Sequence, residues 1–361
     1  MNNLLITGGA GFIGANFVHT MLSTRQDLNL VVLDALTYAG NLHNLSDVRK
    51  NPRLQFVHGD ICDQVLVERL LEENAIDTIV HFAAESHVDR SITGPDAFIQ
   101  ANIVGTHRLL QVARSVWEKS GQLEEKRFHH VSTDEVYGSL SPEDPPFSET
   151  TPYAPNSPYA ASKAASDHLV RACFHTYGLP VTTSNCSNNY GPYQFPEKLL
   201  PLCLLNILTG EPLPIYGDGQ QIRDWLHVDD HSRGIALILD HGNPGETYNI
   251  GGNNEWANID TVKLLCEIVD TLFKEDKVLC EKYPESPVSK GGLSENLITF
   301  VTDRLGHDVR YAINAGKITR DLGYQPEHEF REGLIKTVKW YLENESWWQA
   351  VSDGSYRNLT E

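Results

Sequence analysis

Two adjacent carboxyl side chains, Asp134 and Glu135, follow a short strand-like run of the sequence. Neighbouring carboxyl groups can share acid–base work when their environments push their pKa values apart, because one then holds a proton that the other has lost. Such a pair suits an elimination, in which a base removes one proton and an acid protonates the departing group. The alternative is a solvated acidic turn.

A tyrosine and a lysine four residues apart, Tyr159 and Lys163, share one face of a predicted helix. An ammonium group stabilises a phenolate, and the phenolate can remove a hydroxyl proton while a nicotinamide accepts the hydride. Thr133, at the end of the preceding strand-like run, would orient a substrate hydroxyl beside Tyr159. Taken alone, the two residues could be an exposed helix pair, so their interpretation depends on a cofactor site elsewhere in the chain.

A glycine-rich turn supplies that site, because Gly8, Gly11 and Gly14 follow the first predicted strand and open a helix. Glycine permits a tight turn and close backbone approach, and a helix N-terminus presents free amides to a pyrophosphate. Asp34 ends the next predicted strand, about 20 residues beyond Gly14, where its carboxylate can bind an adenosine ribose. That carboxylate would repel a 2′-phosphate, so the pattern predicts NAD rather than NADP.

The third predicted strand ends at Asp60 and Ile61, which could cover the adenine. The alternative is an Asp that ends a strand and binds no ligand, and this alternative is nearly as frequent. The interpretation of this pair therefore depends on the glycine-rich turn.

The composition is that of a soluble globular protein, with 40% hydrophobic and 21% charged residues in 361. The formal net charge of -19 would repel nucleic acid and anionic membranes, so neither is expected as a partner. A phosphorylated substrate must therefore meet local cations. The six cysteines form no C-x-x-C pair and indicate reduced thiols, with no metal site. No signal peptide or membrane span is apparent, which predicts a cytoplasmic location.

Apolar runs alternate with helical patterns, which predicts a Rossmann-like, doubly wound parallel α/β sheet with a smaller C-terminal α/β substrate lobe. The expected strands are 4–7, 30–33, 54–58, 78–82 and 128–132, and the expected helices are 99–117, 158–177, 261–273 and 330–342. The expected domains are an NAD-binding domain, 1–186, rejoined by about 225–251, and mainly a substrate lobe, 187–361. Residues 283–295, rich in Pro, Ser and Gly, are expected to form a mobile surface loop.

With these features the chain resembles the nucleotide-sugar 4,6-dehydratases of the extended short-chain dehydrogenase/reductase family. The resemblance covers nearly the whole length. Its motifs lie at residues 7–14, 83–91, 132–138, 159–163, 185–193, 223–225 and 303–307.

The resemblance implies dTDP-glucose as the substrate and a closed redox cycle with NAD. Tyr159 would take the 4-hydroxyl proton during oxidation at C4, which acidifies the C5 proton. Glu135 would remove that C5 proton while Asp134 protonates the departing 6-hydroxyl, and the hydride would return at C6. This requires a neutral Asp134 beside a charged Glu135. The product would be a 4-keto-6-deoxy sugar, a precursor for deoxysugar or rhamnose synthesis.

The resemblance also implies further binding residues. On the cofactor side, beside the residues above and the Tyr159–Lys163 pair, these are Phe12, Ile13, Phe82, Ala83, Ala84, Ser86 and Asn189. On the substrate side they are Ser86, Thr133, Asn188, Lys198, Leu199, Pro214, Ile215, Tyr216, Arg223, Asn258, Asp303, Arg304 and His307.

Some of the substrate-side residues have a distinct chemical role or a structural alternative. Arg223 could bind a diphosphate bidentately, and Tyr216 could lie against a pyrimidine or belong to the core. Asn258 could instead cap the following helix, and Lys198 could be merely solvated.

Two other functions stay open from the sequence. A UDP-sugar 4-epimerase or decarboxylase could use the same Tyr159–Lys163 couple, although neither needs the Asp134–Glu135 pair to protonate a leaving hydroxyl. A non-catalytic NAD sensor could keep the nucleotide fold alone. The resemblance further implies a homodimer, and apolar faces on the predicted helices 99–117 and 158–177 could pack between subunits or simply cover the sheet.

Overall fold

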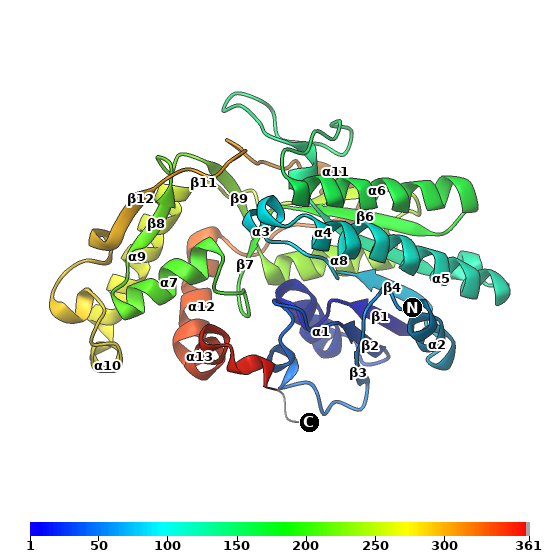
Figure 1. Ribbon diagram of the computed structural model, residues 1–361, viewed down its shortest axis with the longest axis horizontal. Helices are drawn as coiled ribbons and strands as arrows, with labels where there is room; N and C mark the ends of the chain where they lie inside the picture. Colours follow the sequence, from blue (N-terminus) through cyan, green and yellow to red (C-terminus); the bar gives the residue numbers. More distant parts are fainter. Residues whose placement is uncertain (359–361) are drawn as a thin grey trace.

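Apolar runs separated by amphipathic segments form one parallel sheet, and the expected Rossmann-like α/β class is confirmed. The computed structural model describes residues 1–358, and its main sheet has the strand order β10-β6-β5-β4-β1-β2-β3, with every neighbouring pair parallel (Figure 1). The strands are β1 (Asn3–Thr7), β2 (Asn29–Asp34), β3 (Leu54–His58), β4 (Thr78–His81), β5 (Arg127–Thr133), β6 (Val181–Cys186) and β10 (Thr247–Ile250).

Helices cover both faces of this sheet because its strands are apolar on both sides. Leu4 and Ile6 of β1 pack toward α1 (Phe12–Thr24), α8 (Val228–His241) and α11 (Gly316–Leu322). Leu5, between them, packs toward the opposite layer of α2 (Gln64–Glu73), α5 (Thr106–Lys119) and α6 (Pro158–Tyr177). The alternation along one strand therefore builds two separate hydrophobic cores.

The helix that carries Tyr159 and Lys163 has the expected bounds, Pro158–Tyr177, and a capping group lies at each end. Ser157 Oγ accepts a hydrogen bond from the Ala160 amide at 3.1 Å, and Pro158 occupies the first helical turn. Gly178, with φ of 70°, ends the helix in the left-handed conformation that glycine adopts most readily. Local capping chemistry thus fixes both ends of α6.

The expected helix at residues 99–117 is divided in two. A π-helical stretch, Ile99–Gly105, precedes α5, which starts at Thr106. Such widened turns often occur beside functional sites. The apolar period predicted a helix here but could not reveal the change in helix type.

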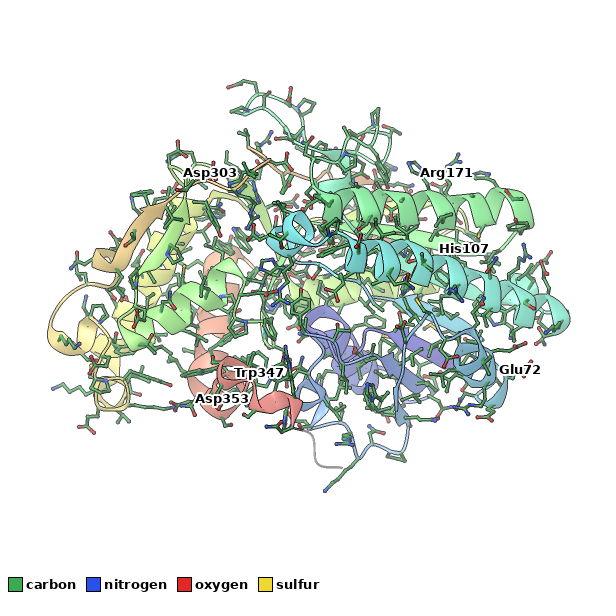
Figure 2. The ribbon with its side chains drawn as sticks, in the orientation of Figure 1. Glu72, His107, Arg171, Asp303, Trp347 and Asp353 are labelled. Atoms are coloured by element: carbon green, nitrogen blue, oxygen red, sulfur yellow. The ribbon has the colours of Figure 1, made fainter. Side chains whose placement is uncertain are left out.

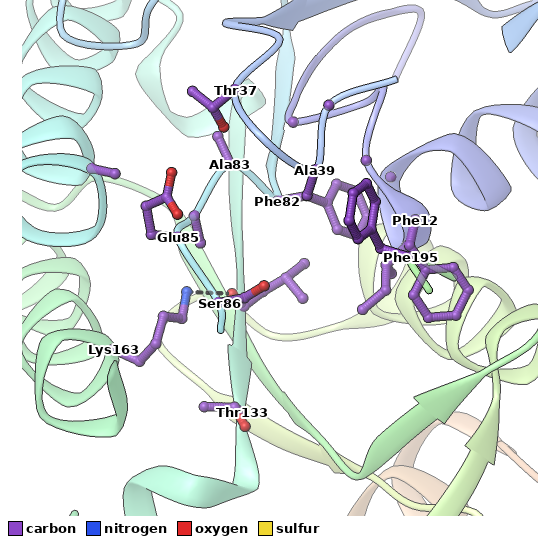
Figure 3. Close-up of a pocket in the computed structure, with 18 of the residues that line it drawn as sticks. Phe12, Thr37, Ala39, Phe82, Ala83, Glu85, Ser86, Thr133, Lys163 and Phe195 are labelled. Atoms are coloured by element: carbon purple, nitrogen blue, oxygen red, sulfur yellow. Dashed lines mark hydrogen bonds between the residues drawn. The ribbon is translucent and has the colours of Figure 1, made fainter. Parts of the chain in front are cut away.

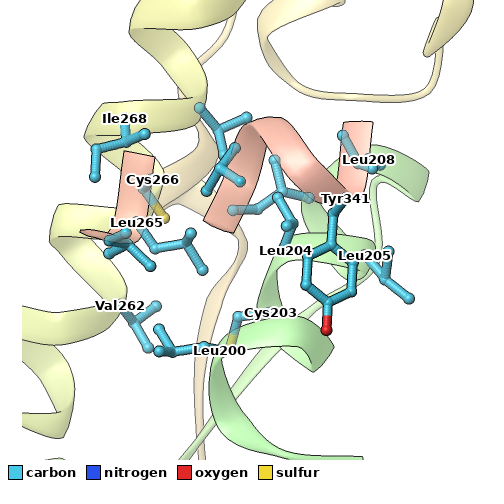
Figure 4. Packing of buried hydrophobic residues seen from close by; sticks show 14 of the residues in the cluster. Leu200, Cys203, Leu204, Leu205, Leu208, Val262, Leu265, Cys266, Ile268 and Tyr341 are labelled. Carbon is cyan, nitrogen blue, oxygen red and sulfur yellow. The ribbon is translucent and has the colours of Figure 1, made fainter. Parts of the chain in front are cut away.

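The C-terminal lobe has its own hydrophobic core, formed mainly by three helices (Figure 4). They are α7 (Leu199–Thr209), α9 (Asn258–Glu275) and α12 (Phe330–Glu343), the last two covering the helices expected at 261–273 and 330–342. The remaining helices of the chain are α3 (Val88–Thr93), α4 (Asp96–Phe98), α10 (Lys277–Lys282) and α13 (Glu345–Asp353). The remaining strands are β7 (Asn188–Tyr190), β8 (Leu213–Tyr216), β9 (Ile222–His227), β11 (Glu255–Ala257) and β12 (Ile298–Val301).

The segment at residues 283–295 is more closely packed than a surface loop would be. Tyr283 and Ser286 are buried, and a short 3₁₀ turn, Val288–Lys290, lies within it. Its mobility stays a prediction.

The chain crosses between the sheet and the lobe more than once. After β9 it returns to the sheet through α8 and β10, and the division into 1–186 and 187–361 therefore remains a proposal. At the far end of the chain, Trp347 of α13, which is labelled in Figure 2, donates from its indole nitrogen to Asn44 Oδ1 at 2.8 Å. No helix within residues 1–358 is both long and apolar enough to cross a membrane.

Candidate active site

The glycine-rich turn lies where the strand order reverses, between β1 and β4. Ligands of such sheets bind in the crevice at this switch point. Gly8 has a φ of 71°, and a Cβ atom there would lie 2.6 Å from the Ala83 nitrogen. Only glycine therefore fits between the two strand ends, and the first turn of α1 faces the crevice with free amides.

Asp34, at the end of β2, is held beside this turn. Its Oδ2 accepts from the Ala10 amide at 2.9 Å and its Oδ1 from the Leu36 amide at 2.8 Å. Burial raises the pKa of Asp34, and these two amides oppose that shift. Each carboxylate oxygen keeps acceptor capacity for a ribose hydroxyl.

One cleft along the carboxyl ends of β1, β2, β4, β5 and β6 is lined by every residue expected to be catalytic or to bind the cofactor (Figure 3). The first set is Thr133, Asp134, Glu135, Tyr159 and Lys163. The second adds Gly8, Gly11, Phe12, Ile13, Gly14, Asp34, Asp60, Ile61, Phe82, Ala83, Ala84, Ser86 and Asn189. Residues spread over most of the sheet domain thus meet at one edge.

The Tyr159–Lys163 couple is buried at the floor of this cleft. Lys163 is only 4% exposed, and its Nζ donates to the Val131 carbonyl at 2.8 Å, the bond drawn in Figure 3. Burial lowers the pKa of Lys163, whereas the nearby Asp167 raises it. Burial and the Glu135 charge raise the pKa of Tyr159 well above its usual value, so the phenolate needs the ammonium beside it.

The carboxyl pair sits on a 3₁₀ turn, Asp134–Tyr137, directly after β5. Thr133 Oγ1 accepts from the Glu135 amide at 3.3 Å and donates to Asp134 Oδ1 at 3.4 Å. Asp134 is 2% exposed, and its Oδ2 has no hydrogen-bond partner among residues 1–358. This oxygen is therefore available to a substrate hydroxyl.

Burial raises the pKa of both carboxyl groups, but unequally. The pKa of Asp134 is raised well above its usual value by burial and by the Glu135 and Asp224 charges. For Glu135 the pKa increase from burial is opposed first by Arg223 and then by Lys198. The environments thus favour a neutral Asp134 and a charged Glu135, the arrangement that elimination requires.

The expected substrate residues divide between the cleft and the lobe beside it. Ser86, Thr133, Asn188 and Lys198 line the cleft. The others lie outside its lining, and they are Leu199, Pro214, Ile215, Tyr216, Arg223, Asn258, Asp303, Arg304 and His307.

Arg223 is the buried cation of this second group, at 7% exposure. Its guanidinium donates to the Ile222 and Asp308 carbonyls at 2.7 and 3.1 Å and lies 4.2 Å from the centre of the Tyr311 ring. No carboxylate forms an ion pair with it within the described chain, residues 1–358. A buried guanidinium without an anion suits a phosphate group.

The other lobe residues differ in what they offer a ligand. Tyr216 is 39% exposed, so it is not core, and the Arg304 guanidinium lies 5.2 Å from its ring centre. Ile215 is 1% exposed within the lobe core and could meet a ligand only through its backbone. Asn258 does not cap α9, because Ala257 occupies the cap position, and its buried Oδ1 has no partner among the residues described.

Sequence reasoning missed Asn102, in the π-helical stretch. Its Nδ2 donates to the Glu85 carbonyl at 3.0 Å and to Ser162 Oγ at 2.8 Å, and its Oδ1 accepts from the Glu85 amide at 2.9 Å. Asn102 thereby ties the chain after β4 to the helix of the Tyr159–Lys163 couple. A single Asn within a helical pattern carries no sequence signal of this role.

A rim of three residues from separate segments was also missed. The Arg90 guanidinium lies 3.9 Å from the Tyr38 ring centre, and its Nη2 atom lies 3.4 Å from Glu197 Oε2. Tyr38 and Glu197 line the cleft. Their proximity arises from the tertiary fold, so spacing in the sequence could not indicate it.

Outside the cleft, donor atoms of His227, Asp229 and His328 lie within 4.8 Å of one another. The two imidazole rings are stacked, with centroids 4.0 Å apart and planes inclined by 19°. A shared metal ion would need to lie in the plane of both rings, which this stacking prevents. We therefore propose no metal site there.

Fold and cleft together are those of an extended short-chain dehydrogenase/reductase. A family model described as GDP-mannose 4,6 dehydratase matches residues 5–337, and the chain belongs to that family.

Relatives named dTDP-glucose 4,6-dehydratase cover nearly the whole chain. One from Neisseria meningitidis serogroup B is 55% identical over 359 residues, 99% of this chain and 98% of the relative. One from Escherichia coli is 52% identical over an alignment of 366 positions, which covers 98% of this chain and 97% of the relative.

Among solved structures, too, the dehydratases are more similar in sequence to this chain than the epimerases are. The dTDP-glucose 4,6-dehydratase of Streptomyces venezuelae, solved with NAD bound, has a TM-score of 0.84 and 48% identity, covering 97% of this chain and 99% of its own. The UDP-glucose 4-epimerase of Thermotoga maritima has a TM-score of 0.80 at 27% identity, covering 95% and 99%. The fold is thus shared with epimerases, whereas the sequence is much more similar to the dehydratases.

Replacing Asp134 by Asn should make the protein more stable near neutral pH. In the unfolded chain this carboxyl loses its proton near the usual aspartate value of about 3.9, whereas burial in the folded protein raises its pKa, so the folded carboxyl keeps the proton to higher pH. Rising pH between these two values therefore favours the unfolded wild-type chain and leaves Asp134→Asn unaffected. We expect a gain of about 0.5–2 kcal/mol in urea unfolding at neutral pH, typical of relieving a strained functional group.

Asp144→Asn is the control, because hydrogen bonds from Ser141 lower the pKa of that exposed carboxyl, and its replacement should bring no gain. Parallel stability curves for wild type and Asp134→Asn between acidic and neutral pH would show that Asp134 is not held protonated.

Proposed function

We propose that this protein is an NAD-dependent dTDP-glucose 4,6-dehydratase, a lyase that converts dTDP-glucose to dTDP-4-keto-6-deoxyglucose. The observation that carries the proposal is the buried Asp134, with the partly buried Glu135 beside it, in the same cleft as the buried Tyr159–Lys163 couple. The similarity to dehydratases of that name over almost the whole chain supports it. The product is a precursor for deoxysugar synthesis.

The glycine-rich turn and Asp34 give the cleft the features that NAD requires. The turn is closed against Ala83 so tightly that only glycine fits, which leaves its backbone and the start of α1 free for a pyrophosphate. The two oxygens of Asp34 remain able to accept from a ribose. When bound, NAD accepts a hydride from C4 of the sugar and later returns it to C6.

The first proton transfer belongs to Tyr159. Its hydroxyl, as phenolate, takes the proton from the sugar 4-hydroxyl, and the Lys163 ammonium stabilises that negative charge. Thr133, buried between Tyr159 and the carboxyl pair, orients the same hydroxyl. The amide contact from Glu135 to Thr133 Oγ1 holds this side chain at the strand end.

Elimination of water belongs to the carboxyl pair. Oxidation at C4 acidifies the C5 proton, and Glu135 removes it as a charged base and gives it back to C5 when the hydride is delivered to C6. Asp134 protonates the 6-hydroxyl as it departs, through the oxygen that has no partner among residues 1–358. Burial raises the pKa of both groups, but the charges of Arg223 and Lys198 oppose the rise at Glu135 and favour its ionised form, whereas the Glu135 and Asp224 charges add to the rise at Asp134 and favour its neutral form.

The nucleotide end of the substrate is assigned to the lobe. Arg223 binds the diphosphate, and the half-exposed Tyr216 with the nearby Arg304 and His307 faces the pyrimidine. Lys198, whose Nζ donates to the Ser86 carbonyl at 3.2 Å, adds a cation on the cleft side.

Two rival functions have weaker support. Epimerases share the fold at 27% identity, but they do not need a proton donor for a leaving hydroxyl, which Asp134 provides. A non-catalytic NAD sensor would have no use for the carboxyl pair. A homodimer and a cytoplasmic location remain predictions, and equilibrium sedimentation tests the first.

The substrate is tested by mass spectrometry of products after incubation with dTDP-glucose and, separately, UDP-glucose, without added reductant. We expect loss of one water from the dTDP sugar, much faster than from the UDP sugar. Equal water loss from both would keep the reaction and refute thymidine selectivity. An unchanged mass together with an epimerised sugar would overturn the dehydratase assignment, and bound NAD with no turnover would favour the sensor.

Replacing Glu135 by Gln should stop the reaction after oxidation, because the base for the C5 proton is lost while Tyr159 and Lys163 remain. We expect reduced nicotinamide to accumulate and water loss to fall by about 100-fold or more. Absorbance and product mass measure the two steps separately. Glu68→Gln, on the exposed side of α2, is the matched control. Unchanged dehydration in Glu135→Gln would remove this residue from the mechanism.

Gly8→Ala should weaken NAD binding by at least about tenfold, because the new Cβ meets the Ala83 backbone. Gly121→Ala is the matched control, with a similar φ of 69° but nothing within 4 Å of the added Cβ. Calorimetric titration with NAD measures both. Equal loss of affinity in the two variants would mean that backbone strain, and not the close approach at the switch point, causes the effect.

A further inference from the structure

A further buried carboxyl group, Asp167, lies one helical turn beyond Lys163 on α6, and the mechanism above does not use it. Asp167 is 5% exposed. It accepts from Ser132 Oγ at 2.8 Å and from the Tyr153 hydroxyl at 3.0 Å, and it lies 3.0 Å from His130 Nε2. A carboxylate that is this deeply buried and this fully hydrogen-bonded is retained at a cost in desolvation.

Two of these partners flank the residue whose carbonyl accepts the hydrogen bond from Lys163. His130 and Ser132 are the neighbours of Val131 on β5, and the Val131 carbonyl accepts from Lys163 Nζ. Two adjacent turns of α6 therefore dock on three consecutive residues of β5. This double contact fixes the position of α6, and with it Tyr159, relative to the strand that ends at Thr133.

Asp167 also supplies the negative charge that favours the protonated form of Lys163. Tyr159 precedes Lys163 by one turn of α6, and the other titratable groups that interact with the Lys163 ammonium are Asp167 of α6, His81 of β4, His130 of β5 and Cys186 of β6. Both histidines are neutral, because burial lowers their pKa values well below the usual one. Burial raises the pKa of the Cys186 thiol to about 12, so the thiol is protonated. Asp167 is the anion that remains at neutral pH.

We propose that Asp167 is a positioning residue that keeps Lys163 protonated and fixed beside Tyr159. Without it, burial alone would act on the lysine, and the ammonium that stabilises the phenolate would be lost at lower pH. The inference rests on the proposed function, because it assigns Lys163 to the oxidation step. The inference adds to the mechanism a residue, Asp167, that contacts neither the sugar nor the cofactor.

The test has two readouts. Carbon-13 NMR of ε-labelled lysine, with Lys163 assigned from Lys163→Met, reports the titration of the ammonium in the protein without substrate. The pH profile of the rapid oxidation of dTDP-glucose reports its consequence. Asp167→Asn removes the charge, Asp167→Glu restores it, and Tyr153→Phe removes one hydrogen bond to Asp167 without changing any charge.

In Asp167→Asn we expect the Lys163 titration and the alkaline limb of oxidation to move about one pH unit or more toward lower pH. Both should return toward wild type in Asp167→Glu, even if the rate stays low, and neither should move in Tyr153→Phe. In the wild type, the Lys163 resonance should also respond as Asp167 itself titrates, near a pKa of about 6.

An unmoved Lys163 titration in Asp167→Asn would overturn the proposal, whatever happens to the rate. If that variant does not fold, absence of the wild-type response near Asp167's own pKa would overturn it equally. Wild-type protein that never loses water from a nucleotide sugar would instead refute the proposed function, and the NMR titration would still decide the role of Asp167.

Discussion

The docking of α6 on the end of β5 is the contact on which the site depends. Tyr159 and Lys163 come from the helix, whereas Thr133, Asp134 and Glu135 come from the strand end and its turn. The two sets can act on one sugar only if helix and strand keep a fixed register. Hydrogen bonds between buried polar groups set that register more sharply than apolar packing, because a buried donor or acceptor left without its partner is costly.

Burial of the reactive groups also sets their protonation states, and this burial has a cost in the stability of the fold. Burial raises the pKa of Asp134 and lowers that of Lys163, so each group is pushed toward its neutral form. The proposed reaction requires the neutral form of Asp134 but the charged form of Lys163. The cleft resolves the conflict by placing a like charge, Glu135, beside Asp134 and an unlike charge, Asp167, beside Lys163. Perturbed groups of this kind concentrate at functional sites for that reason.

Local signals in the sequence predicted what depends on local chemistry. Ser157, Pro158 and Gly178 define α6 at its observed bounds, and the expected strands agree with the observed ones to within a residue or two. The glycine turn and Asp34 predicted one end of the cleft for the same reason. The role of Asn102 could not be predicted, because its partners come from a separate loop and a separate helix. Long-range hydrogen bonds leave no periodic trace in a chain.

The acidic balance of the chain explains why the lobe supplies cations. A net charge of -19 disfavours a diphosphate at long range, so attraction must be local. We propose that Arg223 and Lys198 provide this attraction, and both also act on Glu135, since both oppose the rise of its pKa. A diphosphate bound at Arg223 would share that charge with Glu135. If the proposed roles of Arg223 and Glu135 hold, substrate binding and base strength would therefore be coupled through one guanidinium, which the carboxylate and the diphosphate would share.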